Sequence, residues 1–116
     1  MREKFVVHIT DLAERDLEKA ADYIAYELKN PDAAKNTVQG IRRQINALQI
    51  FPERNDLDED PYLADLGLRM DFYRNYKIYY TVDHASKRVY VIRILHMLVD
   101  SRAWLYRTFG LYSENN

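Results

Sequence analysis

The chain has 116 residues, of which 47% are hydrophobic and 30% charged, and its formal net charge at pH 7 is −1. This size and balance predict one folded domain, which we place at residues 1–112, followed by a frayed tail at 113–116. The absence of cysteine and the presence of only three glycines exclude a disulfide framework, a thiolate nucleophile and a Gly-rich nucleotide loop. No apolar run approaches the roughly 20 residues that cross a bilayer, and we expect a cytoplasmic protein with no membrane contact.

The first half of the chain predicts a strand and two helices. Residues 4–9 alternate between two faces with a period of two, which is typical of a strand. The apolar residues of 11–28 then recur at helical spacing. An Asn-Pro pair at 30–31 starts a second helix over 31–48, and we expect the two helices to form an antiparallel hairpin. Gly40 inside the second helix indicates either a close helix crossing or a tolerated surface position.

The second half predicts a loop, three strands and a short helix. Residues 53–65 hold six acidic residues and one basic residue, a composition typical of an exposed connecting loop. Two alternating segments, 68–73 and 76–82, flank a two-residue turn and predict a β-hairpin. The β-branched run 88–96 predicts a central strand, and a short helix begins near Asp100. The order βααβββα indicates an α+β domain: an N-terminal strand, a helical hairpin, a three-strand antiparallel meander and a C-terminal helix.

A group of polar residues is expected on the sheet face that points away from the helices. If Ile78 faces the helices, Lys77 and Tyr79 face the opposite side. Arg69 and Arg93 interrupt apolar strands, and we expect them to join Lys77 there. Three cations beside a phenol are suited to holding a phosphate backbone and assisting proton transfer in RNA cleavage. The alternative, which the residue chemistry alone favours, is an uncovered face whose cations pair with Asp71 or Asp83.

His96 ends the predicted central strand. Its imidazole suits general acid–base chemistry, because the unperturbed pKa of about 6.5 lies near neutral pH. A packed imidazole is the alternative interpretation, and a single sequence favours it. No group of His or carboxylate residues has the spacing of metal ligands, and the acidic segment 53–65 lacks the glycine and terminal glutamate of an EF-hand loop. We therefore expect no metal and no cofactor.

Several segments resemble the RelE/ParE family of bacterial toxins. They are the initial strand, the junction Asn30-Pro31-Asp32-Ala33-Ala34, the run from Asn75 to Asp83, and the run from Val89 to His96 followed by Asp100. The last run is similar to the family's final strand and its His-x-Arg-Arg-Asp ending. This resemblance covers residues 4–105. It implies the toxin of a type II toxin–antitoxin system, of the kind associated with growth inhibition and plasmid stabilisation, neutralised by a cognate antitoxin.

The resemblance implies one of two activities. RelE-like members cut messenger RNA in the ribosome, and ParE-like members act on DNA gyrase without a comparable catalytic set. A RelE-like catalytic set in this chain would be Arg69, Lys77, Tyr79, Arg93 and His96. Leu98 and Val99 stand where the nuclease pattern has two arginines, which favours the ParE-like activity slightly. A third hypothesis is a degenerate member that only binds an antitoxin.

The net charge of −1 conceals two oppositely charged segments. Residues 53–65 carry a net charge of −5, whereas 66–107 hold eight basic and three acidic residues, a net charge of +5. The C-terminal sheet is therefore suited to RNA, DNA-bound gyrase or an acidic antitoxin segment, with 53–65 as an intramolecular competitor. We also expect an antitoxin to cover apolar surface on the hairpin and the sheet edge.

Overall fold

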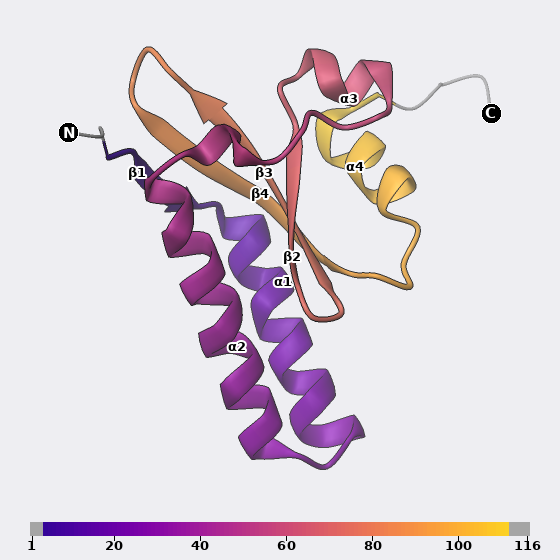
Figure 1. The fold of residues 1–116 in the computed structure, drawn as a ribbon. Coiled ribbons are helices and arrows are strands. Elements are labelled where there is room, and N and C mark those ends of the chain that lie inside the picture. Colours follow the sequence, from indigo (N-terminus) through magenta and orange to yellow (C-terminus); the bar gives the residue numbers. More distant parts are fainter. Residues whose placement is uncertain (1–3, 112–116) are drawn as a thin grey trace.

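The computed structural model describes residues 4–111 and confirms the predicted order of strands and helices (Figure 1). Its elements are β1 (Val6–Ile9), α1 (Asp11–Asp22), α2 (Pro31–Asn46), α3 (Pro61–Asp65), β2 (Arg69–Tyr73), β3 (Tyr76–Asp83), β4 (Arg88–His96) and α4 (Ser101–Phe109). A π-helical turn over Tyr23–Glu27 follows α1, and 3-10 turns over Ala47–Gln49 and Pro52–Arg54 follow α2. The end of the predicted domain at 112 and the predicted tail at 113–116 lie outside the described residues. No helix within residues 4–111 is long and apolar enough to span a membrane.

The four strands form one sheet in the order β1-β4-β3-β2. The predicted meander is confirmed, because β2, β3 and β4 pair antiparallel in chain order. β1 pairs parallel to the first half of β4, with Ile9 opposite Val91. A register shift lies between Tyr79, which faces Arg93, and Tyr80, which faces Val91. Ile92 is therefore an extra residue in β4, and this bulge changes which side chains of β4 share a face.

Both long helices begin at capping side chains, and the Asn-Pro start of α2 is the predicted one. Thr10 caps α1, since its side chain accepts a hydrogen bond from the Ala13 amide, and its hydroxyl donates to the Val91 carbonyl at 2.7 Å. Asn30 caps α2 by accepting from the Ala33 amide at 3.0 Å, and Pro31 takes the first helical position. The cap of α1 thus also joins the end of β1 to the neighbouring strand β4.

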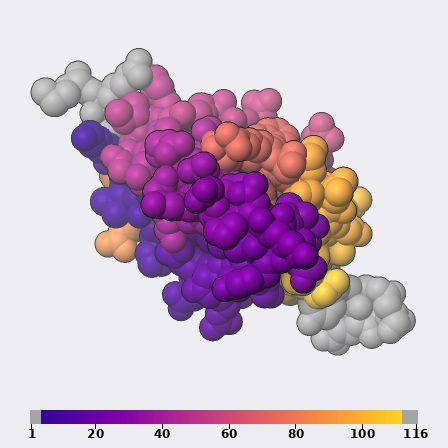
Figure 2. Space-filling model, turned by 90° about the horizontal axis from the view of Figure 1, so that it is seen from below, coloured from indigo at the N-terminus to yellow at the C-terminus, as the bar shows by residue number. Residues whose placement is uncertain are grey.

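The helical hairpin covers one face of the sheet and builds the larger core, as predicted. Figure 2, which looks from the hairpin end, shows α1 and α2 in front of the sheet with α4 to one side. The most deeply buried members of this core are Ala13, Leu17, Ile41, Ile45, Leu48, Ile78, Tyr80, Val89 and Val91. The Tyr80 hydroxyl donates to the Pro52 carbonyl at 2.6 Å and accepts from the Asn55 side chain at 3.1 Å. Both polar functions of this buried phenol are therefore satisfied.

Gly40 marks a contact between α2 and the sheet, not a crossing of two helices. A Cβ placed on Gly40 would lie 2.0 Å from Cζ of Tyr73 in β2. The ring of Tyr73 therefore fills the space that any larger side chain at position 40 would need. Neither of the two sequence-based interpretations of this glycine was right, because the contact joins residues from elements that are distant in the chain.

The second face of the sheet is covered as well. The prediction for 53–65 was right in that most of this connecting segment is exposed, but it missed the helix α3 and the burial of Leu63. α3 and α4 lie on this face (Figure 1), where they help form a second core. Its buried members are Leu63, Leu68, Tyr79, Leu95 and Leu105. The Asp60 side chain caps α3 by accepting from the amides of Tyr62 and Leu63, and Pro61 is its first residue. An Asp-Pro helix start was thus present in a segment that its polarity alone assigned to a loop.

Candidate functional site

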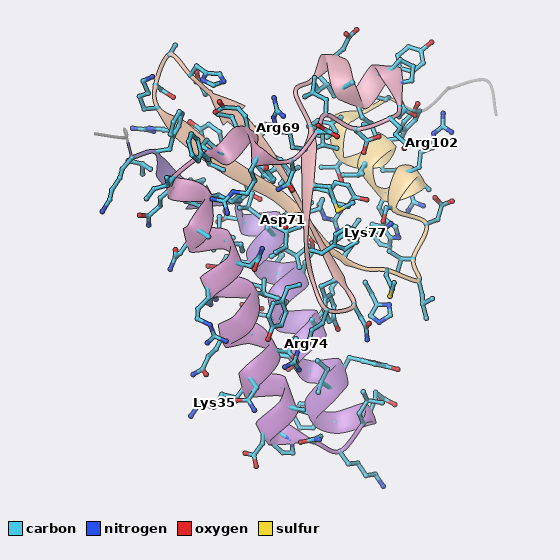
Figure 3. All side chains as sticks on the ribbon, in the orientation of Figure 1. Lys35, Arg69, Asp71, Arg74, Lys77 and Arg102 are labelled. Carbon is cyan, nitrogen blue, oxygen red and sulfur yellow. The ribbon has the colours of Figure 1, made fainter. Side chains whose placement is uncertain are left out.

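Lys77 and Tyr79 are the predicted site residues that do lie together. Both line a cleft of about 560 Å³ between α3, β3 and the beginning of α4, and Figure 3 shows Lys77 on the side of the sheet that carries α4. Four carboxylates also line the cleft, from Asp58, Glu59, Asp60 and Asp100, against only two cations, from Lys77 and Arg102. Among residues 4–111, no carboxylate forms an ion pair with Lys77. The cleft therefore carries a net negative charge.

The Tyr79 side chain is part of the second core, with only 4% of its surface exposed. Burial raises the pKa of its hydroxyl above the ordinary value for tyrosine. The phenol is therefore protonated at neutral pH. This environment opposes a role as general base, which requires the phenolate form.

Arg69 does not share a face with Lys77, and that expectation was wrong. Arg69 pairs with Tyr80, whose side chain is in the hairpin core, whereas Lys77 pairs with Phe72. Residues 69 and 77 therefore project from opposite faces of the sheet, as side chains alternate along each strand. The Arg69 guanidinium donates to the backbone carbonyl of Asn55, which holds it beside the Pro52–Arg54 turn.

Arg93 is buried in an ion pair, so the expectation that it joins Lys77 on an open face was also wrong. Its Nε and Nη2 each donate to a carboxylate oxygen of Asp16 at 2.8 Å, and both side chains are 7% exposed. Its Nη1 donates to the Thr108 hydroxyl at 3.1 Å. Asp16 also accepts from the Ile94 amide at 2.9 Å. Arg93 therefore pairs with neither Asp71 of β2 nor Asp83 of β3, which the alternative interpretation predicted as its partners.

Sequence reasoning missed Asp16, although a signal was present. Asp16 lies three residues after Ala13 and four before Ala20, which places it at the border of the apolar stripe of α1. A carboxylate on a buried helix position requires a buried cation or several donors. The position of Asp16 thus indicated a buried partner, but it did not show which of the strand cations, Arg69, Lys77 or Arg93, that partner is.

The imidazole of His96 packs against an aromatic ring, on the sheet face opposite Lys77. Its ring meets that of Tyr76 edge to face, with 5.2 Å between the ring centroids. Its Nδ1 accepts a hydrogen bond from the Leu98 amide at 3.1 Å. His96 is therefore the packed imidazole of the alternative interpretation, and the thickness of the sheet separates it from Tyr79. The five predicted site residues are therefore not one constellation.

The acidic segment holds α4 through Asp60. One Asp60 oxygen accepts from the Tyr106 hydroxyl at 2.7 Å and from Arg102 Nε at 2.8 Å. The hydrogen bond from Tyr106 is the main reason that the pKa of Asp60 lies below its ordinary value. Within residues 4–111, no cluster of three or more His, Cys, Asp or Glu side chains has the geometry of a metal site.

Comparisons with known proteins agree with this fold. The family described as "ParE toxin of type II toxin-antitoxin system, parDE" matches residues 7–100. No curated protein sequence matches the chain. A solved structure of the chromosomal ParDE toxin–antitoxin system from P. aeruginosa is similar with a TM-score of 0.67 and 23% identity, covering 80% of this chain and 96% of that chain.

Two further solved structures share the fold at lower identity. The toxin–antitoxin complex RelBE2 from Mycobacterium tuberculosis has a TM-score of 0.55 and 19% identity, covering 81% of this chain and 92% of that chain. A mutant of the E. coli toxin RelE in the free state has a TM-score of 0.60 and 13% identity, covering 87% of this chain and 92% of that chain. The family match spans β1 to the end of β4, so this chain belongs to the ParE toxin family of type II toxin–antitoxin systems.

Proposed function

We propose that this toxin arrests growth by binding a protein target, DNA gyrase, and that it does not cut RNA. The observation that supports this proposal is the arrangement of its cations. Arg93 is neutralised by Asp16 in a buried pair, and Lys77 stands in a cleft with four carboxylates. Cleavage of a phosphodiester requires positive groups aimed at the charge that develops on the phosphorus oxygens. Among residues 4–111, the only cations that line the cleft beside Tyr79 are Lys77 and Arg102.

The electrostatics of the cleft also oppose RNA binding. Contacts to phosphate oxygens supply much of the affinity for nucleic acids, and they come from cations and amide donors. A phosphate that entered beside Lys77 would approach Asp58, Glu59 and Asp100. The second cation of the cleft, Arg102, is already paired with Asp60.

Neutralisation by a cognate antitoxin completes the proposal. The similar structures from P. aeruginosa and M. tuberculosis are a chromosomal ParDE toxin–antitoxin system and a RelBE2 toxin–antitoxin complex. This chain also exposes large apolar side chains on several elements, including Tyr26 at 75% and Leu98 at 84%. Such surfaces are typical of interfaces with a partner protein.

The proposal is tested by inducible expression without an antitoxin, combined with two biochemical readouts. We expect growth arrest, inhibition of gyrase-catalysed supercoiling by the purified protein, and intact messenger RNA. Lys77→Ala should leave growth arrest unchanged, as should the matched control Lys35→Ala on the outer side of α2 (Figure 3). Arg93→Ala is unsuitable as a test, because it would leave Asp16 buried without its partner.

Three results would contradict the proposal. New cut sites in translated messenger RNA that disappear in Lys77→Ala, and persist in Lys35→Ala, would establish the RelE-like nuclease. Normal growth during expression of the folded protein, together with antitoxin binding, would establish a degenerate member. Supercoiling that the purified protein leaves unaffected, despite growth arrest, would exclude gyrase as the target.

A further inference from the structure

The cleft between α3, β3 and α4 carries more negative charge than its own cations balance. Its four carboxylates and two cations leave a net charge of −2 among the lining residues. Arg102 is already paired with Asp60, with 2.8 Å between Nε and Oδ2. Lys77 is therefore the cation that remains beside the other three carboxylates, those of Asp58, Glu59 and Asp100. This charge is complementary to a cationic ligand.

A buried hydroxyl in the cleft lacks a hydrogen-bond partner. Ser101 is the first residue of α4, it lines the cleft, and only 9% of its surface is exposed. Among residues 4–111, its Oγ is the one buried side-chain nitrogen or oxygen that forms no hydrogen bond. Folding removes this hydroxyl from water without replacing the hydrogen bonds that water gave it, which is unfavourable. A ligand that bonds to Oγ from the cleft would remove this cost.

The Tyr79 phenol and the Asp58 carboxylate lie near this hydroxyl. Burial raises the pKa of Tyr79, the Ser101 hydroxyl lowers it, and the charge of Asp58 raises it. Ser101 and Asp58 are thus both close to the phenol, although the two hydroxyls are not aligned for a hydrogen bond. One Asp58 oxygen accepts from the Asp60 amide at 2.9 Å, which fixes the position of this carboxylate. A primary ammonium has three N–H donors, and these three side chains supply three acceptors.

The rest of the lining combines apolar walls with exposed carboxylates. The apolar members are Pro61, Leu63, Val99 and Leu105. Leu63 and Leu105 belong to the second core and are each 1% exposed, so these walls are held by packing. Glu59 and Asp100 are exposed. The volume of about 560 Å³ is in the range of small-molecule sites, about 300–1,000 Å³. Methylene groups can pack on the walls while a second cationic group meets the exposed carboxylates.

We propose that this cleft binds a short aliphatic diamine, with one ammonium at Ser101, Tyr79 and Asp58 and the other at Glu59 and Asp100. The two positive charges of the ligand match the net charge of −2. A metal ion is less suited, because no group of three or more His, Cys, Asp or Glu side chains within residues 4–111 has metal-site geometry. The bound diamine would join α3, β3 and the start of α4, and so stabilise the folded state. This inference goes beyond the proposed function and does not depend on it.

Isothermal titration calorimetry on the full chain tests the proposal, with putrescine as the probe near neutral pH and at low ionic strength. We expect saturable binding of one putrescine per chain. Butylamine has the same chain length with one ammonium, and its Kd should be at least about tenfold higher. Magnesium chloride should compete no better than sodium chloride of equal ionic strength. Absence of saturable binding, equal affinity for butylamine, or specific displacement by Mg²⁺ would each overturn the proposal.

Ser101→Ala distinguishes a ligand contact from a structural role. Because the Ser101 hydroxyl has no partner in the fold, its removal should leave the melting temperature of the ligand-free protein unchanged or raise it. The same substitution should raise the Kd for putrescine at least about threefold, since one acceptor is lost. An unchanged Kd, or a lower melting temperature of the ligand-free protein, would refute the placement of the ammonium at Ser101 and the proposal with it.

Charge substitutions with matched controls test whether the cleft itself holds the ligand. Glu59→Gln should raise the Kd several-fold, whereas Glu27→Gln, at an exposed position in the turn after α1, should leave it within about twofold. Lys77→Gln should lower the Kd several-fold, because it removes a competing cation from the cleft. Lys35→Gln on α2 should not. Equal effects of each cleft variant and its control would show a non-specific attraction between the diamine and the whole protein, and would rule out the site.

Discussion

The buried ion pair between Asp16 and Arg93 is expected to be the largest single polar contribution to stability in this fold. Asp16→Ala removes two hydrogen bonds of 2.8 Å to the guanidinium and one of 2.9 Å from the Ile94 amide. Hydrogen bonds to charged groups contribute about 1.5–3 kcal/mol each. Loss of one member of a buried pair costs about 3–5 kcal/mol, because the other charge stays buried without a partner. We expect a loss of about 3–5 kcal/mol.

Urea unfolding followed by circular dichroism measures this loss. With a urea m-value of about 2 kcal/mol per molar, the transition midpoint should fall by roughly 2 M. Glu14→Ala is the matched control, since Glu14 pairs with Arg42 at a similar 2.9 Å but the two side chains are 42% and 46% exposed. That control should cost less than about 1 kcal/mol. Similar midpoints for Asp16→Ala and Glu14→Ala would refute the reasoning, because burial would then make no difference.

Three further predictions concern contacts found only in the folded structure. Gly40→Ala should destabilise the protein by about 1–3 kcal/mol in urea unfolding despite its better helix propensity, and Tyr73→Leu in the same chain should remove most of that loss. Tyr80→Phe should cost about 1–3 kcal/mol, since it leaves the Pro52 carbonyl without its donor, and an unchanged midpoint would contradict this. The pKa of Asp60 is lower in the folded protein than in the unfolded chain, where it is about 3.9. The Asp60 carboxylate therefore stabilises the fold fully above the pKa of the unfolded chain, and this stabilisation is lost as the pH falls through the lower pKa of the folded state. Between pH 2 and 6, the melting temperature of Asp60→Asn should therefore fall less steeply toward low pH than that of the wild-type protein. An equally steep fall would argue against this role of Asp60.

Local signals were sufficient to predict most of the elements. The Asn30-Pro31 pair starts α2, and the alternation of β3 around Ile78 correctly predicts its core face. Capping, helical periodicity and strand alternation involve residues within a few positions of one another, so they can be read before any tertiary contact is known. α3 was missed because the acidity of 53–65 outweighed its Asp-Pro start, and burial of Leu63 depends on β3 and α4.

The sites of the cations could not be predicted in the same way. Alternation shows which residues of one strand share a face, but the face of Arg69 relative to Lys77 depends on how β2 and β3 pair. The bulge at Ile92 changes the alternation inside β4, and the partner of Arg93 is 77 positions away in the chain. The fold therefore does not assemble the expected group of Arg69, Lys77 and Arg93 on one open face.

The amino-acid sequence by itself determined the order of the strands and of every helix except α3, the Asn-Pro start of α2, and the segments that resemble the RelE/ParE toxins. Those properties depend on short-range patterns of polarity and backbone preference. Only the tertiary structure decided that Arg93 is neutralised by Asp16, that Lys77 stands among carboxylates, and that the buried hydroxyl of Ser101 lies unpaired in the same cleft. Each of these depends on strand register and helix placement, which bring together side chains that no local pattern connects.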